Sequence, residues 1–128
     1  MTNKSSYREL PLVYACSGCS SAAQLTNALA VRLDRAKLAE MSCIAGVGGE
    51  VPALLRIATA ERPKVVLDGC PLHCARSCLQ RQGIAPDLHI DLSREGIRKK
   101  MHADPTVEEI ERILQTVVSP RIAALLST

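Results

Sequence analysis

Six cysteines are the residues of this sequence most suited to chemistry, because thiolates bind metal ions and attack electrophiles. They are Cys16, Cys19, Cys43, Cys70, Cys74 and Cys78. Cys16, Cys43 and Cys70 follow one another at equal intervals of 27 residues. This spacing predicts three successive structural units of similar length, each with a cysteine at an equivalent place.

An apolar run precedes or contains each of these three cysteines and predicts a buried strand. The predicted strands are 10–15, 38–44, 65–67 and 88–92. Helical patterns separate them, and strands that alternate with helices are typical of a parallel sheet with helices on both faces. We therefore expect a single α/β domain over residues 1–128. It should be a small three-layer domain whose four-stranded, mainly parallel sheet has the order 2-1-3-4.

Glycine, proline and cap residues predict where the helices begin and end. Pro71 is well placed as the first residue of the third helix. The glycines of residues 46–49 predict a flexible turn before the second helix. Thr106 starts a capping-box pattern for the last long helix, which we expect Pro120 to end or kink.

Parallel strands all end at one edge of the sheet, so cysteines from distant parts of the sequence meet there. Neighbouring strands are about 4.8 Å apart, and zinc holds each sulfur at about 2.3 Å. Cys16, Cys43 and Cys70 can therefore converge on one ion, with Cys74 as a fourth ligand from the first turn of the next helix. The positive ends of three helices point at this edge and favour thiolates. The sequence thus predicts a tetrahedral zinc site.

The two remaining cysteines are candidate metal ligands with plainer alternatives. Cys19 is within reach of the same edge. Cys78 lies one helical turn deeper and is equally well explained as a buried small side chain. We interpret Asp68 as a turn and helix-cap residue rather than as a group that orients a ligand. His73 is interpreted as a bystander or an orienting group, and His89 is assigned no role.

Three motifs of the chain resemble the DGC-domain family, which takes its name from an Asp-Gly-Cys sequence. They are Cys16-Ser-Gly-Cys-Ser, Cys43-Ile-Ala-Gly-Val-Gly-Gly and Leu67-Asp-Gly-Cys-Pro-Leu-His-Cys74. The resemblance covers about residues 12–115. It implies a zinc-binding protein with four candidate chelating cysteines, which correspond here to Cys16, Cys43, Cys70 and Cys74. It implies no particular reaction or substrate.

Two other functions use the same cysteines. Cys16-Ser-Gly-Cys19 follows a predicted strand and opens a helix, as in thiol redox or sulfur-transfer enzymes with a thioredoxin-like motif. Four thiolates also hold iron-sulfur clusters, although the compact cysteine run of a ferredoxin is missing here. The sequence does not establish whether the protein is an enzyme. It leaves open whether a bound metal is structural, sensed, carried or catalytic.

Composition and charge argue against several other classes of protein. The formal net charge of +3 is too small to indicate nucleic-acid binding, and we interpret the basic run at 94–100 as a solvated surface. No apolar run forms a signal peptide or approaches the roughly 20 residues of a membrane span. We therefore expect a cytoplasmic protein whose thiols stay reduced. The sequence indicates neither a protein partner nor an oligomeric state.

Overall fold

The computed structural model describes residues 6–127 and has a four-stranded sheet in the order β2-β1-β3-β4. The strands are β1 (Leu12–Ala15), β2 (Glu40–Met41), β3 (Lys64–Asp68) and β4 (Leu88–Asp91). All the strand pairs are parallel, and Val13 lies opposite both Met41 and Val65. The predicted α/β class and strand order are confirmed.

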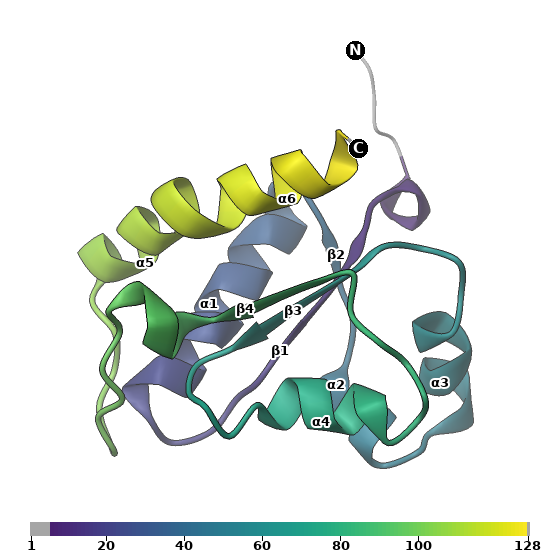
Figure 1. Ribbon diagram of the computed structural model, residues 1–128, viewed down its shortest axis with the longest axis horizontal. Coiled ribbons are helices and arrows are strands. Elements are labelled where there is room, and N and C mark those ends of the chain that lie inside the picture. Colours follow the sequence, from purple (N-terminus) through teal and green to yellow (C-terminus); the bar gives the residue numbers. More distant parts are fainter. Residues whose placement is uncertain (1–5, 128) are drawn as a thin grey trace.

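Helices cover both faces of the sheet (Figure 1). One face carries α1 (Ser21–Arg35), α5 (Val107–Ile113) and α6 (Ser119–Leu126). The other face carries α2 (Ile44–Gly48), α3 (Pro52–Ala58) and α4 (Cys74–Gln80). Short helical turns lie at η1 (Tyr7–Glu9), η2 (Leu92–Glu95) and η3 (Leu114–Val118). The result is the expected three-layer arrangement.

Two apolar layers hold these helices to the sheet. Strand side chains alternate between the two faces, so Val13 and Val65 pack with α1, α5 and α6. Leu12, Tyr14 and Val66 point the other way and pack with α2, α3 and α4. All five side chains are fully buried. The two layers therefore hold the strands in place, and the ends of the strands set the positions of the loops that follow them.

The segment after β2 differs from the expectation. The predicted second strand shrinks to Glu40–Met41, and the glycine-rich stretch, expected as a flexible turn, forms α2. A Cβ at Gly46 would collide with the side chain of Leu54. The glycine therefore lets α2 pack closely on α3. The glycine spacing alone does not distinguish this close packing from a turn. Cys43 consequently becomes the N-cap of α2 rather than part of a strand.

The start of α4 also differs from the expectation. Pro71 does not begin the helix, which starts only at Cys74. His73, immediately before it, has a left-handed backbone with φ of 53°, and this conformation does not continue a right-handed helix. The first turn of α4 is capped by Asp68, whose carboxylate accepts hydrogen bonds from the backbone N–H groups of Ala75 and Arg76.

The C-terminal helical region continues through the expected break. The Thr106 hydroxyl accepts a hydrogen bond from the Glu109 N–H and caps α5, as the capping-box pattern predicted. The helix then widens into the π-helical turn η3 and continues as α6, which has Pro120 in its first turn. Proline lacks the N–H of a regular helix, and the wider turn accommodates this loss.

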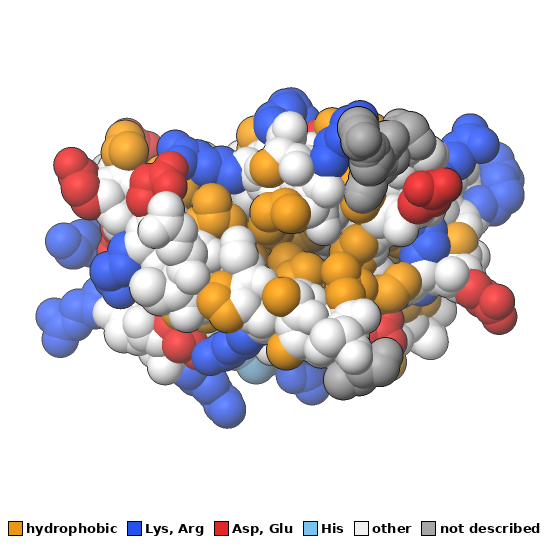
Figure 2. Space-filling view, turned by 90° about the horizontal axis from the view of Figure 1, so that it is seen from above, with side chains coloured by type: hydrophobic (Ala, Val, Ile, Leu, Met, Phe, Trp, Pro, Cys, Tyr) orange, Lys and Arg blue, Asp and Glu red, His pale blue; other side chains and the backbone are white. Residues whose placement is uncertain are grey.

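An apolar hollow opens beside α6, on the face shown in Figure 2. It is lined by Leu33, Leu38, Ser119, Ile122, Ala123 and Leu126. None of these residues lines the cavities that contain cysteines.

Among the described residues, no helix combines the length and the apolar character needed to cross a bilayer.

Candidate metal centre

Four of the six cysteines line one cavity at the carboxyl ends of β1 and β3. Cys16 and Cys19 come from the loop between β1 and α1, whereas Cys70 and Cys74 come from the loop after β3 and the start of α4. The cavity has a volume of about 190 Å³. All six thiols of the chain are free. The parallel pairing of β1 with β3 thus brings together two loops that are far apart in the sequence.

The Cys16 thiol is held by hydrogen bonds on two sides. Its sulfur lies 3.1 Å from the Thr26 hydroxyl and accepts a hydrogen bond from the Gly69 N–H at 3.3 Å. Burial raises the pKa of the Cys16 thiol, although these two hydrogen bonds oppose the rise. Without a nearby cation, Cys16 is therefore mostly a neutral thiol at neutral pH. A bound metal ion would supply the charge that stabilises its thiolate.

Each residue of the Asp-Gly-Cys segment after β3 has its own structural role. Asp68 is 1% exposed and caps α4, in agreement with its interpretation from the sequence. A Cβ at Gly69 would lie 2.7 Å from the backbone oxygen of Ala22, so glycine is needed for the loop to pass this close to α1. Cys70 then lines the cavity. The segment therefore sets the position of the loop that carries Cys70 and the start of the helix that carries Cys74.

One wall of the cavity comes from a segment after η2 that the sequence did not indicate. The Ser21 N–H donates to the Lys100 oxygen at 2.8 Å, and the Lys100 N–H donates to the Ser21 hydroxyl at 3.0 Å. This pairing places Lys99 and Met101 on the cavity wall. The Lys99 ammonium lies 3.6 Å from the Cys70 sulfur. The basic residues of this run are exposed, as interpreted from the sequence, and one of their charges also adjoins a thiol.

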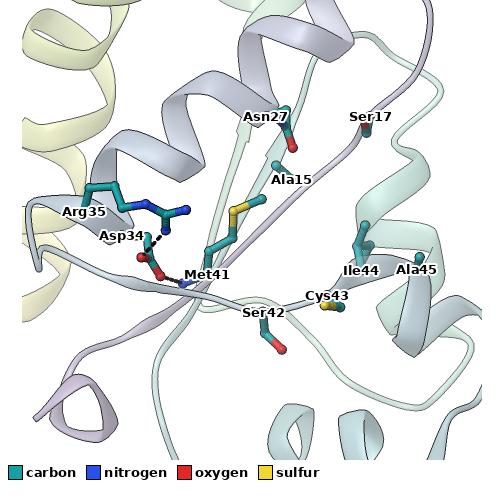
Figure 3. Close-up of a pocket in the computed structure, with 10 residues that line it drawn as sticks. All are labelled: Ala15, Ser17, Asn27, Asp34, Arg35, Met41, Ser42, Cys43, Ile44 and Ala45. Carbon is teal, nitrogen blue, oxygen red and sulfur yellow. Dashed lines mark hydrogen bonds and ion pairs between the residues drawn. The ribbon is translucent and has the colours of Figure 1, made fainter.

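Cys43 and Cys78 lie outside this cavity. Cys43 lines a neighbouring cavity, shown in Figure 3, that also includes Ser17. Ser17 lines both cavities, so Cys43 is at the same edge of the sheet but not among the four clustered thiols. Cys78 is partly buried on α4 and faces Gly48 of α2. This grouping differs from the expected one, in which Cys43 rather than Cys19 joins the other three.

The chemistry of the cavity suits a thiophilic ion, although its four sulfurs are not gathered around one point. Among residues 6–127, no three Cys, His, Asp or Glu side chains are grouped so that they could hold a metal ion. Cys19 and Cys74 are exposed, so their side chains are free to rotate. Thiolates select zinc, copper(I) or iron-sulfur clusters over the harder ions that prefer oxygen. The donor set therefore suits a thiophilic ion, although the described side chains do not already surround one.

Two histidine–aspartate pairs lie on the β4 side of the loop after β3. The Nε2 atoms of His89 and His73 are each 2.8 Å from a carboxylate oxygen, of Asp68 and Asp91 respectively. The two imidazole rings meet edge to face with their centroids 4.6 Å apart. Burial would raise the pKa of the Asp91 carboxyl, but hydrogen bonds from Ser93 and His73 outweigh it and lower the pKa. These pairs depend on the register between β3 and β4 and on the conformation of the loop after β3, which no local sequence signal indicates.

We expect Cys16 to be the slowest of the four cavity thiols to react with iodoacetamide in metal-free protein. Alkylation requires the thiolate, and burial raises the pKa of the Cys16 thiol, so little thiolate is present at neutral pH. The exposed Cys19 and Cys74 should be labelled earlier. Mass spectrometry of peptides after timed labelling measures this order. Labelling of Cys16 before the other thiols would contradict the described environment.

Fold and site together define a class of protein: a small parallel α/β domain with free cysteines at the carboxyl edge of its sheet. The DGC domain family matches residues 12–117. The chain belongs to this family, as its three motifs indicated. A protein of Pseudomonas aeruginosa, the "Anaerobic and virulence modulator AnvM", is 56% identical to it over 114 residues, or 87% of each protein. No solved structure matches the chain.

Proposed function

We propose that the chain binds a zinc ion through cysteine thiolates at the carboxyl edge of its sheet. The observation that carries this proposal is the meeting of four free thiols, from two distant loops, around one cavity. Four cysteines are a common ligand set of structural zinc sites. The metal would keep the sulfurs in the thiolate form and would tie the two loops together.

Three of the proposed ligands are common to the cavity and to the family's cysteine pattern: Cys16, Cys70 and Cys74. The cavity favours Cys19 as the fourth ligand, whereas the family pattern favours Cys43. Both thiols are exposed, so protection from iodoacetamide by bound zinc distinguishes them. The one that stays reactive in the zinc-loaded protein is not a ligand. Cys78, which faces α2, is outside the proposed set.

The surroundings of the sulfurs support a site for charged thiolates. The Gly69 N–H donates to the Cys16 sulfur at 3.3 Å, and the Lys99 ammonium lies 3.6 Å from the Cys70 sulfur. Hydrogen bonds and cations next to the ligands of a metal offset ligand charge and orient the ligating atoms. Gly69 would thus orient Cys16, and Lys99 would balance part of the negative charge of a four-thiolate set.

The alternatives receive less support from these surroundings. A catalytic dithiol needs a nucleophilic thiol with a lowered pKa, whereas burial raises the pKa of the Cys16 thiol. An iron-sulfur cluster would use the same sulfurs and is distinguished by its visible colour. Free thiols agree with the reducing cytoplasm.

Removal of the metal should lower the melting temperature, because only the folded chain offers the assembled site. Elemental analysis of anaerobically purified protein should give about one zinc ion per chain, and an absorption scan should show no iron-sulfur colour. Chelation should then shift the melting curve downward, and added zinc should restore it. Metal-free protein whose melting curve is unaffected by zinc would contradict the proposal. A brown, iron-containing protein would favour the cluster instead.

A further inference from the structure

A further cavity, on the β4 side of the loop after β3, is lined entirely by ionisable side chains. Its volume is about 200 Å³. Three of the lining residues are arginines: Arg76 from α4, Arg94 from η2 and Arg121 from α6. The others are Asp91, Glu95 and the two paired histidines. None is a cysteine, and no residue is shared with the thiol cavity.

The carboxylates of this cavity are already engaged by neighbouring groups. One Asp91 oxygen accepts hydrogen bonds from the backbone and the hydroxyl of Ser93, and the other lies 2.8 Å from His73 Nε2. Glu95 accepts a hydrogen bond from Arg121 at 2.7 Å. These acids therefore present little unpaired negative charge to the cavity.

Two of the arginines, by contrast, keep unused donors. No carboxylate between residues 6 and 127 forms an ion pair with the guanidinium of Arg76 or Arg94. Three guanidinium groups face two carboxylates, so the cavity has a net positive charge even when both histidines are neutral. Arg76 is only partly exposed, which limits the water that screens it. The cavity therefore offers several cationic donors to an anion.

The wall of this cavity is fixed by contacts behind it. His89 is paired with Asp68, which is 1% exposed, and its ring packs edge to face on His73. His73 has a left-handed backbone, with φ of 53°, which is unfavourable for a residue with a side chain. Its contact with Asp91 holds it there. These contacts fix the histidine wall of the cavity, whereas the exposed Arg94 side chain becomes ordered only when a ligand binds.

We propose that this cavity binds a phosphoryl group, of inorganic phosphate or of a small phosphomonoester. Guanidinium groups donate in pairs to phosphate oxygens and are weakly hydrated. The three arginines come from three different elements, and donors on several sides suit a tetrahedral anion whose oxygens diverge. A planar carboxylate suits this cavity less well, because a single guanidinium can already bind both of its oxygens. The cavity also lies at the carboxyl end of β4, the edge at which open α/β sheets bind ligands.

Calorimetric titration of the full chain with inorganic phosphate, in a low-salt buffer, tests this proposal. Arg76→Ala and Arg94→Ala should each weaken phosphate binding roughly tenfold, the effect of one hydrogen bond to a charged group. Arg94→Lys should retain part of the affinity, because it keeps the charge but loses the paired donors. Glu95→Gln should tighten binding, since it removes a negative charge and releases Arg121. Arg56→Ala, on the exposed surface of α3, should bind as the unmodified chain does.

Further titrations distinguish the source of the phosphoryl group and the contribution of the thiol cavity. Tighter binding of glycerol 3-phosphate than of phosphate would identify a phosphomonoester, and the reverse would identify the free anion. Cys70→Ser should leave phosphate binding unchanged, so this proposal and the zinc proposal fail independently. Succinate bound as tightly as phosphate would overturn the proposal. So would equal phosphate affinity of Arg94→Ala and Arg56→Ala in proteins with unchanged melting curves.

Discussion

Asp68→Ala should lower the free energy of unfolding by about 3–5 kcal/mol, because it leaves buried partners of a charged group unpaired. The Asp68 side chain is 1% exposed, and its oxygens accept hydrogen bonds from the N–H groups of Ala75 and Arg76 and contact His89. Alanine would leave two helix N–H groups and an imidazole without their acceptor. Since small domains have only about 5–15 kcal/mol of stability in total, the melting temperature should fall sharply.

Two variants provide matched comparisons for Asp68→Ala. Asp68→Asn keeps the size of the side chain and one oxygen that can accept a hydrogen bond from the Ala75 N–H. Its amide NH₂ group, however, would face the Arg76 N–H, so two donors would meet without an acceptor. Asp68→Asn should therefore lower the free energy of unfolding by about 1–3 kcal/mol. Asp104 is exposed, so Asp104→Ala should change the stability by less than about 0.5 kcal/mol. Urea unfolding followed by circular dichroism measures all three. Equal stability of Asp68→Ala and Asp104→Ala would rule out the capping role.

Cys70→Ser should weaken zinc binding by about 100-fold or more, since loss of a group that only orients a ligand already costs about 10–100-fold. Serine replaces a soft thiolate with a protonated hydroxyl, which zinc binds poorly. Cys70 is common to the cavity and the family's cysteine pattern, and its sulfur lies 3.6 Å from Lys99 Nζ. Competition with a coloured zinc chelator measures the affinity.

Cys78→Ser is the control for this loss, because Cys78 faces α2 rather than the cavity. It should retain nearly the zinc affinity of the unmodified chain. Cys19→Ser and Cys43→Ser should then differ from each other, and the larger loss identifies the fourth ligand. If Cys78→Ser lost zinc while Cys70→Ser retained it, the site would lie along α4 and not at the end of the sheet.

The sheet was predictable because its signals are local and repeated. The runs at 10–15 and 65–67 are short and apolar, the segment 88–92 alternates apolar with polar residues, and right-handed crossovers between parallel strands limit the possible orders. Parallel pairing by itself places the carboxyl ends of all four strands at one edge of the sheet. For this reason the meeting of Cys16 with Cys70 and Cys74 could be derived before the structure was known.

The details of the site were less predictable because they depend on tertiary packing. The glycines before Val51 suggested a turn, but Gly46 and Gly48 instead allow α2 to pack against Leu54 of α3 and Cys78 of α4, and Cys43 at the start of α2 lines a separate cavity. Lys99 approaches Cys70 only because its segment pairs with the start of α1. His89 finds Asp68 only across two neighbouring strands. None of these contacts has a signature in the order of nearby residues.

The most direct test of the central claim is a titration of anaerobic, metal-free protein with Co²⁺, followed by absorption. Cobalt occupies zinc sites, and tetrahedral thiolate coordination gives it strong visible and sulfur-to-metal bands, whereas octahedral oxygen coordination gives only weak ones. We predict strong bands that stop rising at about one equivalent of cobalt, that disappear when zinc is added and that are lost in Cys70→Ser. Weak bands that are the same in the unmodified chain and in Cys70→Ser would contradict a thiolate metal centre.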